Sequence, residues 1–221
     1  LLEAKRLSLP LLDHCEDRDM VQNYAVNEGA VSRRLGLPGR PAVAEELQIM
    51  RDVMLAEDTG AHVHICHIST AKGVDIVRQA KARGVHVTCE TCPQYFTLTE
   101  DEILRQGTMA RVNPPRRTQA DVDGIRAGLA DGTIDAIVTD HAPHTAGEKS
   151  KPLPDAPSGM VGLETSLALA LTGLYHTGLL PLAQVLDLMS AAPAALLGLD
   201  KGTLAAGRDA DLILFDPDQE W

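Results

Sequence analysis

Short apolar segments alternate with longer helical segments along most of this chain, and this alternation limits the fold more than any other feature. Apolar runs of strand length, each followed by a stretch with helical spacing, predict strand–helix units on a parallel sheet. The predicted strands are residues 9–13, 62–66, 85–89 and 134–139, and the helices between them include 42–59, 71–83 and 118–130.

Four such units correspond to one half of a (β/α)8 barrel, a fold whose active sites lie at the carboxyl ends of the strands. A doubly wound open sheet is the alternative, but no glycine-rich phosphate-binding loop follows any predicted strand. We therefore expect an α/β fold that is part of a (β/α)8 TIM-like barrel.

Several local patterns add detail to this prediction. Residues 99–106 have the pattern of a short helix that opens with a capping box of Thr99 and Glu102. Residues 142–159 form a proline-rich loop, long enough to be a binding loop. Two apolar helices are expected at 162–177 and 181–197, and an alternating β-segment at 211–216. Helical spacing also predicts one apolar face in the helix 42–59, formed by Leu47, Met50, Val53, Met54 and Leu55.

Composition excludes some classes of partner. The chain has 221 residues and a formal net charge of −11, which argues against nucleic acid and against an anionic membrane surface. No apolar run approaches the roughly 20 residues that span a bilayer. The first residues have no methionine and resemble the end of a helix, so we expect the chain to begin within its fold. Its four cysteines are expected to be reduced thiols of a cytoplasmic enzyme, including the C-x-x-C pair Cys89 and Cys92.

Three residues that commonly bind metals end three of the predicted strands. His14, His67 and Asp140 are far apart in the sequence, but a barrel would bring them to one rim. Two imidazoles and a carboxylate are a suitable ligand set for a divalent ion such as zinc. The alternative is that each is an isolated polar residue at a strand end, and spacing alone does not separate the two interpretations.

The local sequences around these residues resemble the cyclic amidohydrolases, and among them the dihydroorotases of the bacterial class I type. The similarity extends over nearly the whole chain and is carried by five motifs in order: His14-Cys15-Glu16-Asp17, His67-Ile68-Ser69-Thr70, Glu90-Thr91-Cys92-Pro93, Asn113-Pro114-Pro115-Arg116 and Thr139-Asp140-His141-Ala142-Pro143-His144. The resemblance implies that residues 1–200 are about strands 5–8 of the barrel with their helices. It also implies that residues 201–221 are a strand entering a small β-sandwich domain.

The resemblance further implies roles for individual residues. His14 and His67 would be metal ligands, and Asp140 would be both a ligand and the catalytic acid/base. The substrate would be bound by Asn113, His144, Ser158 and Gly159, the last two mainly through their backbones. The remaining histidines are interpreted as structural, including the His-x-His spelling at 62 and 64, because alternation places both on one side of a strand.

The implied reaction is the zinc-dependent, reversible hydrolysis of dihydroorotate to N-carbamoyl-aspartate in pyrimidine biosynthesis, with one or two zinc ions. The family's first-strand His-x-His, its adjacent substrate-binding Arg and its bridging residue on the fourth strand have no counterpart here. We therefore expect this chain alone to be inactive or very weak. A homodimer or a complex with aspartate transcarbamoylase is an expected assembly. The alternatives are a non-catalytic scaffold subunit of aspartate transcarbamoylase and a hydantoinase- or allantoinase-type enzyme.

Overall fold

Four parallel strands form the central sheet of the computed structural model, which describes residues 1–220. The strand order is β1-β4-β5-β6, so strands that follow one another along the chain, apart from a small insertion, are also neighbours in space. The strands are β1 (Leu11–Asp13), β4 (Val63–Ile65), β5 (Val87–Thr91) and β6 (Ala136–Ile137). This order and direction, with a helix after each strand, match one half of a (β/α)8 barrel.

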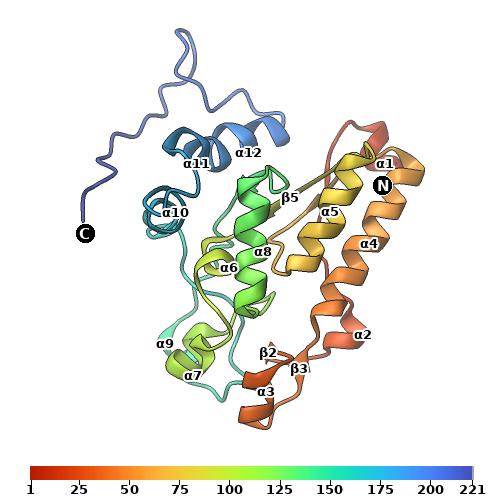
Figure 1. Cartoon of the computed structure of the whole chain (residues 1–221), viewed down its shortest axis with the longest axis vertical. Helices are drawn as coiled ribbons and strands as arrows, with labels where there is room; N and C mark the ends of the chain where they lie inside the picture. Colours follow the sequence, from red (N-terminus) through yellow and green to blue (C-terminus); the bar gives the residue numbers. More distant parts are fainter. Residues whose placement is uncertain (221) are drawn as a thin grey trace.

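Helices cover one face of this sheet, and Figure 1 shows α4, α5 and α8 side by side in front of the strands. The larger helices are α4 (Ala42–Thr59), α5 (Ala71–Ala82), α8 (Gln119–Ala130), α11 (Leu182–Met189) and α12 (Ala191–Leu196). The shorter ones are α1 (Leu2–Arg6), α2 (Arg18–Val21), α3 (Ala30–Leu35), α6 (Pro93–Thr97), α7 (Glu102–Gln106), α9 (Ala146–Lys149), α10 (Ser166–Ala170), a 3-10 turn at Gly107–Ala110 and a π-helical turn at Leu171–Tyr175. A small second sheet of β2 (Val26–Asn27) and β3 (Gly39–Arg40) lies between β1 and α4 in the sequence.

The hydrophobic core lies between the sheet and these helices. Alternate strand residues such as Val63, Ile65 and Val87 face the helices and are almost fully buried, together with Ile49 of α4 and Val77 of α5. Burial of side chains of this size stabilises the fold by about 1.5–3 kcal/mol each. This layer fixes the strands, and thereby the positions of the residues at their carboxyl ends.

The opposite face of the sheet is polar where β4 and β5 pair. His64 lies in register with Thr88, and its Nδ1 is 2.8 Å from the Thr88 hydroxyl. His64 Nε2 is 3.0 Å from a carboxylate oxygen of Glu90, and His62 Nε2 is 2.8 Å from the same Thr88 hydroxyl. The two histidines of the His-x-His spelling therefore share one side of β4, as predicted, and hydrogen-bond within the sheet.

The four predicted strands and the helices 42–59, 71–83 and 118–130 are confirmed, although most strands are shorter than predicted. The helix ends have clear causes. The Thr70 hydroxyl accepts the N–H of Gly73 at the start of α5, and Thr118 and Asp121 form a capping box at the start of α8. Helix α4 ends at Gly60 with φ of +65°, a left-handed conformation that glycine adopts without a steric cost.

The predicted apolar face of α4 is wrong in its orientation. Of the five residues assigned to it, only Val53 is buried, and Leu47, Met50, Met54 and Leu55 are exposed. The buried side of α4 instead includes the polar residues Glu45 and Asp52. Hydropathy cannot predict this choice, because each buried carboxylate is compensated by specific hydrogen bonds.

Three local predictions also need correction. The capping box at Thr99 does not form: residues 99–102 make a turn, and α7 begins at Glu102 without a side-chain cap. The helix predicted at 162–177 begins only at Ser166 and becomes π-helical from Leu171. The helix predicted at 181–197 is interrupted at Ser190, because Pro193 has no N–H to continue the hydrogen-bond ladder of α11.

The β-segment predicted at 211–216 is not a strand in this structure, where residues 201–220 contain no strand. Ile213 and Leu214 are largely exposed, and no neighbouring strand in the described part of the chain pairs with them. A strand needs such a partner for its backbone groups. In Figure 1 this tail extends from α12 across the top of the molecule to the C-terminus.

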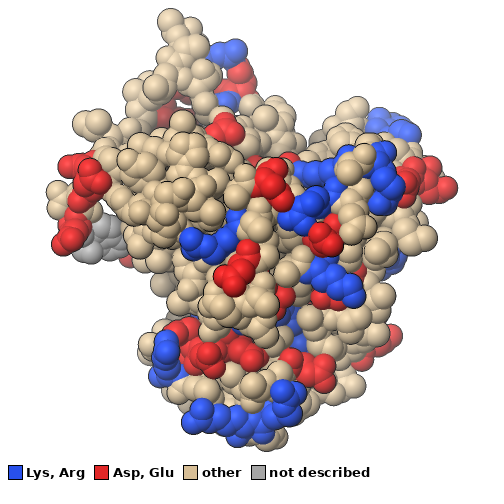
Figure 2. Space-filling view, viewed as in Figure 1, with Lys and Arg blue, Asp and Glu red and all other residues tan. Residues whose placement is uncertain are grey.

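Charged side chains of both signs lie on the surface of the molecule. On the face shown in Figure 2, Lys and Arg side chains are interspersed with Asp and Glu, without a continuous basic surface. Among the described residues, none of the helices has both the length and the apolar character needed to cross a bilayer.

Candidate metal centre

The carboxyl ends of β1, β4 and β6 surround a cavity of about 620 Å³. His14 follows β1, His67 follows β4 and Asp140 follows β6, and all three line this cavity. Cys66 and Glu90 also line it. The structure therefore places the three residues that the sequence predicts as metal ligands around one cavity.

The two imidazoles point toward each other. His14 Nδ1 lies 3.0 Å from His67 Nε2, and the ring planes make an angle of 75°. Two Zn–N bonds of about 2.0–2.1 Å in a tetrahedral site would place the two nitrogens about 3.3 Å apart. A small widening of the observed pair is therefore enough to hold a zinc ion, and the donor set fits that metal.

His67 and Asp140 share an uncommon backbone conformation. Their φ angles are +36° and +47°, a region that residues other than glycine seldom adopt, and the chain has only two other such residues among those described. Both residues stand where a strand turns into its following loop, and the left-handed turn changes the direction of the side chain there. Strained residues of this kind concentrate at functional sites.

The pKa values of these residues suit metal binding. Burial, together with the nearby His14, lowers the pKa of His67, so the imidazole is neutral and able to act as a ligand. Burial raises the pKa of Asp140, although His67 and His14 oppose this shift. Asp140 is thus less acidic than an ordinary aspartate, which favours a role in accepting and returning a proton.

Asn113 approaches the same site, and Arg40 fixes the orientation of its amide. An Arg40 Nη1 donates to Asn113 Oδ1 at 2.5 Å, and the same nitrogen contacts the Glu16 carboxylate. Asn113 Nδ2 therefore faces His14, with 3.3 Å to its Nε2. Because a guanidinium only donates hydrogen bonds, this contact turns the Asn113 oxygen toward Arg40 and the amide nitrogen toward His14.

The predicted substrate residues of the long loop form a second group. His144 Nε2 lies 2.9 Å from the Ser158 carbonyl, and the Gly159 N–H donates to the Arg111 carbonyl at 2.9 Å. These residues do not line the cavity of His14 and His67. The loop also contains a short helix that was not predicted, α9, which opens with a capping box of Thr145 and Glu148.

Sequence reasoning missed several polar residues around the site, namely Glu16, Arg40, Cys66, Glu90, Arg111 and Lys149. Glu16, Cys66 and Glu90 could have been found from the sequence, since each lies inside or beside one of the five motifs that resemble the dihydroorotases. Burial, together with Glu90, Asp13 and Asp140, raises the pKa of the Cys66 thiol to about 12, so the thiol is protonated at neutral pH. Nothing in the local sequence of Arg40 or Lys149 indicates their contacts.

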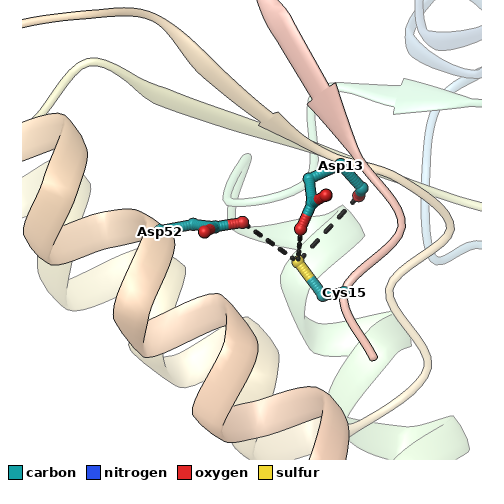
Figure 3. Close-up of side chains that lie close together, drawn as sticks. All are labelled: Asp13, Cys15 and Asp52. Carbon is teal, nitrogen blue, oxygen red and sulfur yellow. Dashed lines mark hydrogen bonds between the residues drawn. The ribbon is translucent and has the colours of Figure 1, made fainter. Parts of the chain in front are cut away.

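A second cluster of potential ligands lies between β1 and α4, and Figure 3 shows its three side chains converging. Potential ligand atoms of Asp13, Cys15 and Asp52 all lie within 4.8 Å of one another, a distance that His14, His67 and Asp140 do not meet as a set of three. Burial and hydrogen bonding with Asp13 raise the pKa of Asp52 to about 6, and burial raises the pKa of the Cys15 thiol. A protonated thiol between two carboxylates that compete for a proton is a poor ligand set, so we assign this cluster a structural role.

A slightly larger hollow, of about 670 Å³, lies between α11, α12 and the tail. Its lining is formed by residues such as Leu186, Met189, Leu212 and Phe215, and it contains none of the predicted site residues. The smaller cavity at the strand ends is therefore the better candidate for chemistry.

Four parallel strands, covering helices and convergent ligands at the strand ends define the class of protein: a partial (β/α)8 barrel of the metal-dependent hydrolase type. The chain belongs to the amidohydrolase family, whose model matches residues 18–220.

The chain is also similar to curated proteins of known name. The chain is 52% identical over 218 residues to a dihydroorotase of Ruminiclostridium cellulolyticum, covering 99% of this chain and 51% of that enzyme. It is 48% identical over 221 residues to a dihydroorotase of Clostridioides difficile, covering 100% of this chain and 52% of that enzyme. The chain thus spans about half the length of the curated relatives it matches.

Solved structures agree with the fold. A dihydropyrimidinase from Brevibacillus agri NCHU1002 superposes with a TM-score of 0.85 at 25% identity, covering 95% of this chain and 48% of that one. An L-hydantoinase from Arthrobacter aurescens gives a TM-score of 0.82 at 29% identity, with the same coverage. The predicted fold class is therefore confirmed, with this chain corresponding to about half of each structure.

Proposed function

We propose that this chain provides one half of the catalytic barrel of a zinc-dependent dihydroorotase. The observation that carries the proposal is the convergence of His14 and His67 at 3.0 Å, in a chain about 50% identical to curated dihydroorotases. The substrate is a small molecule, and we propose dihydroorotate, which is hydrolysed reversibly to N-carbamoyl-aspartate in pyrimidine biosynthesis.

His14 Nδ1, His67 Nε2 and the Asp140 carboxylate would hold the metal from this half of the barrel. Zinc bound there would activate a water near neutral pH and polarise the carbonyl of the cyclic amide. Three protein ligands and a water are enough for a single catalytic zinc ion, whereas a pair of ions would require further ligands beyond these three.

Asp140 acts as the acid/base in this proposal. Its raised pKa lets the carboxylate accept a proton from the attacking water and then deliver it to the ring nitrogen that leaves. Asn113 binds an acceptor of the substrate, a carbonyl or carboxylate oxygen, because its own oxygen is turned toward Arg40. His144, with Ser158 and Gly159, forms the loop side of the substrate site.

A hydantoinase-type activity is the second candidate, because the similar solved structures are a dihydropyrimidinase and hydantoinases. The reaction would still be the hydrolysis of a cyclic amide, and only the ring of the substrate would differ. The higher identity to curated dihydroorotases, 47–52% against 24–29% for these structures, favours dihydroorotate.

We also propose an assembly and a location. The edge strands β1 and β6 each have one neighbour in the sheet, which is compatible with pairing to further barrel strands, a second copy or an aspartate transcarbamoylase subunit. The four cysteines are free, in keeping with a cytoplasmic location.

The test is ring opening by the complete gene product with added zinc, using dihydroorotate, hydantoin and allantoin in parallel. Turnover of dihydroorotate alone supports the proposal, and turnover of hydantoin alone supports the second candidate. A folded protein that opens none of the three rings would contradict both and would favour a scaffold role beside aspartate transcarbamoylase.

A further inference from the structure

Lys149 is a buried lysine whose ammonium group contacts only backbone carbonyls. The residue is 5% exposed, and among the residues that the structure describes its ammonium group donates to three backbone carbonyls. The Nζ donates to the carbonyls of Thr108 at 3.2 Å, Arg111 at 3.3 Å and Pro157 at 3.0 Å. An ammonium without a counter-ion is costly to bury, so these three contacts must hold it in place.

The three carbonyls belong to two segments that Lys149 ties together. Thr108 and Arg111 lie at the 3-10 turn that leads to Asn113, whereas Pro157 lies at the end of the long loop. The Thr108 hydroxyl returns a hydrogen bond to the carbonyl of Lys149 itself. The lysine therefore connects the segment before Asn113 with the residues just before Ser158 and Gly159.

Arg111 strengthens the same connection. Its Nε donates to the Ser158 hydroxyl at 3.3 Å, and its Nη1 donates to the Leu153 carbonyl at 2.6 Å. Its carbonyl accepts both the Lys149 ammonium and the Gly159 N–H. The Arg111 carbonyl thus accepts one hydrogen bond from Lys149 and one from Gly159. Together they hold the peptide of Gly159 against the 3-10 turn.

His144 depends on the position of this peptide. Its Nε2 lies 2.9 Å from the Ser158 carbonyl, and a Cβ added at Gly159 would come within 3.0 Å of the same nitrogen. A displacement of residues 157–159 would therefore change the direction of the imidazole. The contacts run without interruption from the Lys149 ammonium through Pro157 and Ser158 to His144.

We propose that Lys149 is a positioning residue for substrate binding: it holds the loop peptide 157–159, and through it His144, in the conformation that receives the substrate. This inference rests on the proposed function for the identity of the substrate, while the contacts that define it are independent of that function. The residue acts through the loop and touches neither the metal ligands nor the reacting atoms.

The test is Lys149→Met in the complete gene product, with KM and kcat for dihydroorotate measured separately. Methionine keeps the length of the side chain and removes the three donors. The expected result is a rise in KM of about tenfold or more with kcat changed less than about threefold, since substrate binding is lost and the acid/base is untouched. Lys149→Arg keeps the charge and donors and should recover part of the affinity.

Lys81→Met is the matched control. Lys81 also donates to a backbone carbonyl, that of Thr133 at 2.8 Å, and to the Asp135 carboxylate at 2.6 Å, but it lies away from the loop. This variant should lower thermal stability without raising KM. A rise in KM of the same size in Lys81→Met would overturn the proposal, because the effect would then reflect general destabilisation.

A second readout does not depend on activity. Hydrogen exchange at the Gly159 amide, which is bonded to the Arg111 carbonyl, should accelerate in Lys149→Met and stay slow in Lys81→Met. If the wild-type protein opens no dihydroorotate, the proposed function fails while this exchange result still decides whether Lys149 holds the loop. If Lys149→Met does not fold, Thr108→Val serves as the second variant. It removes the hydrogen bond from the Thr108 hydroxyl to the Lys149 carbonyl and should also raise KM. An unchanged KM or an unchanged Gly159 exchange rate in a folded variant would overturn the inference.

Discussion

His14 and His67 lie 53 residues apart in the sequence, yet their Nδ1 and Nε2 atoms are 3.0 Å from each other at the ends of neighbouring strands. This contact follows from the parallel pairing of β1 with β4, which places consecutive strand ends side by side. It brings two isolated histidines into contact, and the proposed metal site rests on this pair.

Replacing Asp140, the proposed acid/base, should remove catalysis while leaving the fold intact. Asp140→Asn keeps the size of the side chain and removes its ability to exchange a proton, so kcat for dihydroorotate should fall by about 10²–10⁴. Asp123→Asn, on the exposed side of α8, is the control and should retain wild-type turnover. Turnover within about threefold of wild type in Asp140→Asn would show that another group carries the proton.

The orientation of Asn113 should depend on Arg40. In Arg40→Met, the Asn113 amide loses the donor that holds its oxygen, and we expect KM for dihydroorotate to rise about tenfold. A double-mutant cycle with Asn113→Ala measures the coupling. The double variant should bind substrate no worse than Asn113→Ala alone, and fully additive losses would mean that Arg40 acts independently of Asn113.

The close approach of the loop at Gly159 should exclude any side chain there. Gly159 has φ of +137°, and a Cβ would lie 2.6 Å from the Ala142 carbonyl and 3.0 Å from His144 Nε2. Gly159→Ala should therefore raise KM at least tenfold and reduce the free energy of unfolding by about 1–3 kcal/mol. Gly147→Ala, in the same loop but with no atom within 4 Å of the added Cβ, should leave KM unchanged.

Asp52 should make a contribution to the free energy of unfolding that is lost as the pH rises from about 4 to about 7. Its pKa is raised from 3.8 to about 6 by burial and by Asp13, so the folded state binds a proton that the unfolded state has already released. The contribution of Asp52 to the free energy of unfolding should decrease across this range by about 2 kcal/mol, whereas His67, whose pKa is lowered, contributes a change of opposite sign. Asp13, whose pKa is lowered, changes charge below this range.

Chemical denaturation of the complete gene product at several pH values measures this slope. Asp52→Asn should flatten it, because asparagine keeps the shape of the side chain and has no proton to exchange. Asp58→Asn, on the exposed side of the same helix, is the control and should keep the wild-type slope. A slope that survives in Asp52→Asn would assign the pH dependence to another group.

Sequence reasoning predicted the strands, most helices and the residues at the strand ends. These features depend on local periodicity and on the rule that the carboxyl ends of parallel strands lie at one edge of the sheet. They can therefore be predicted from a single sequence. Sequence reasoning could not predict the positive φ angles of His67 and Asp140. It also could not predict the three carbonyls that accept hydrogen bonds from Lys149. Each depends on contacts between segments distant in the chain, such as Lys149 with Thr108.

The orientation of α4 illustrates the same limit. Its sequence offers an apolar side with Leu47 and Met50, but the structure buries Glu45 instead. Glu45 accepts hydrogen bonds from Ser69, Thr70 and Arg117, which offset the cost of burying its charge. These partners lie more than 20 residues away, so helical periodicity cannot reveal them.

The most direct measurement is a crystal structure of the complete gene product with zinc, using anomalous scattering at the zinc absorption edge. We expect a peak between His14 Nδ1 and His67 Nε2, within coordination distance of about 2.0–2.1 Å of both nitrogens, with the Asp140 carboxylate facing the same site. A peak at Asp13, Cys15 and Asp52, or no peak beside His14 and His67, would contradict the proposed metal centre and the function built on it.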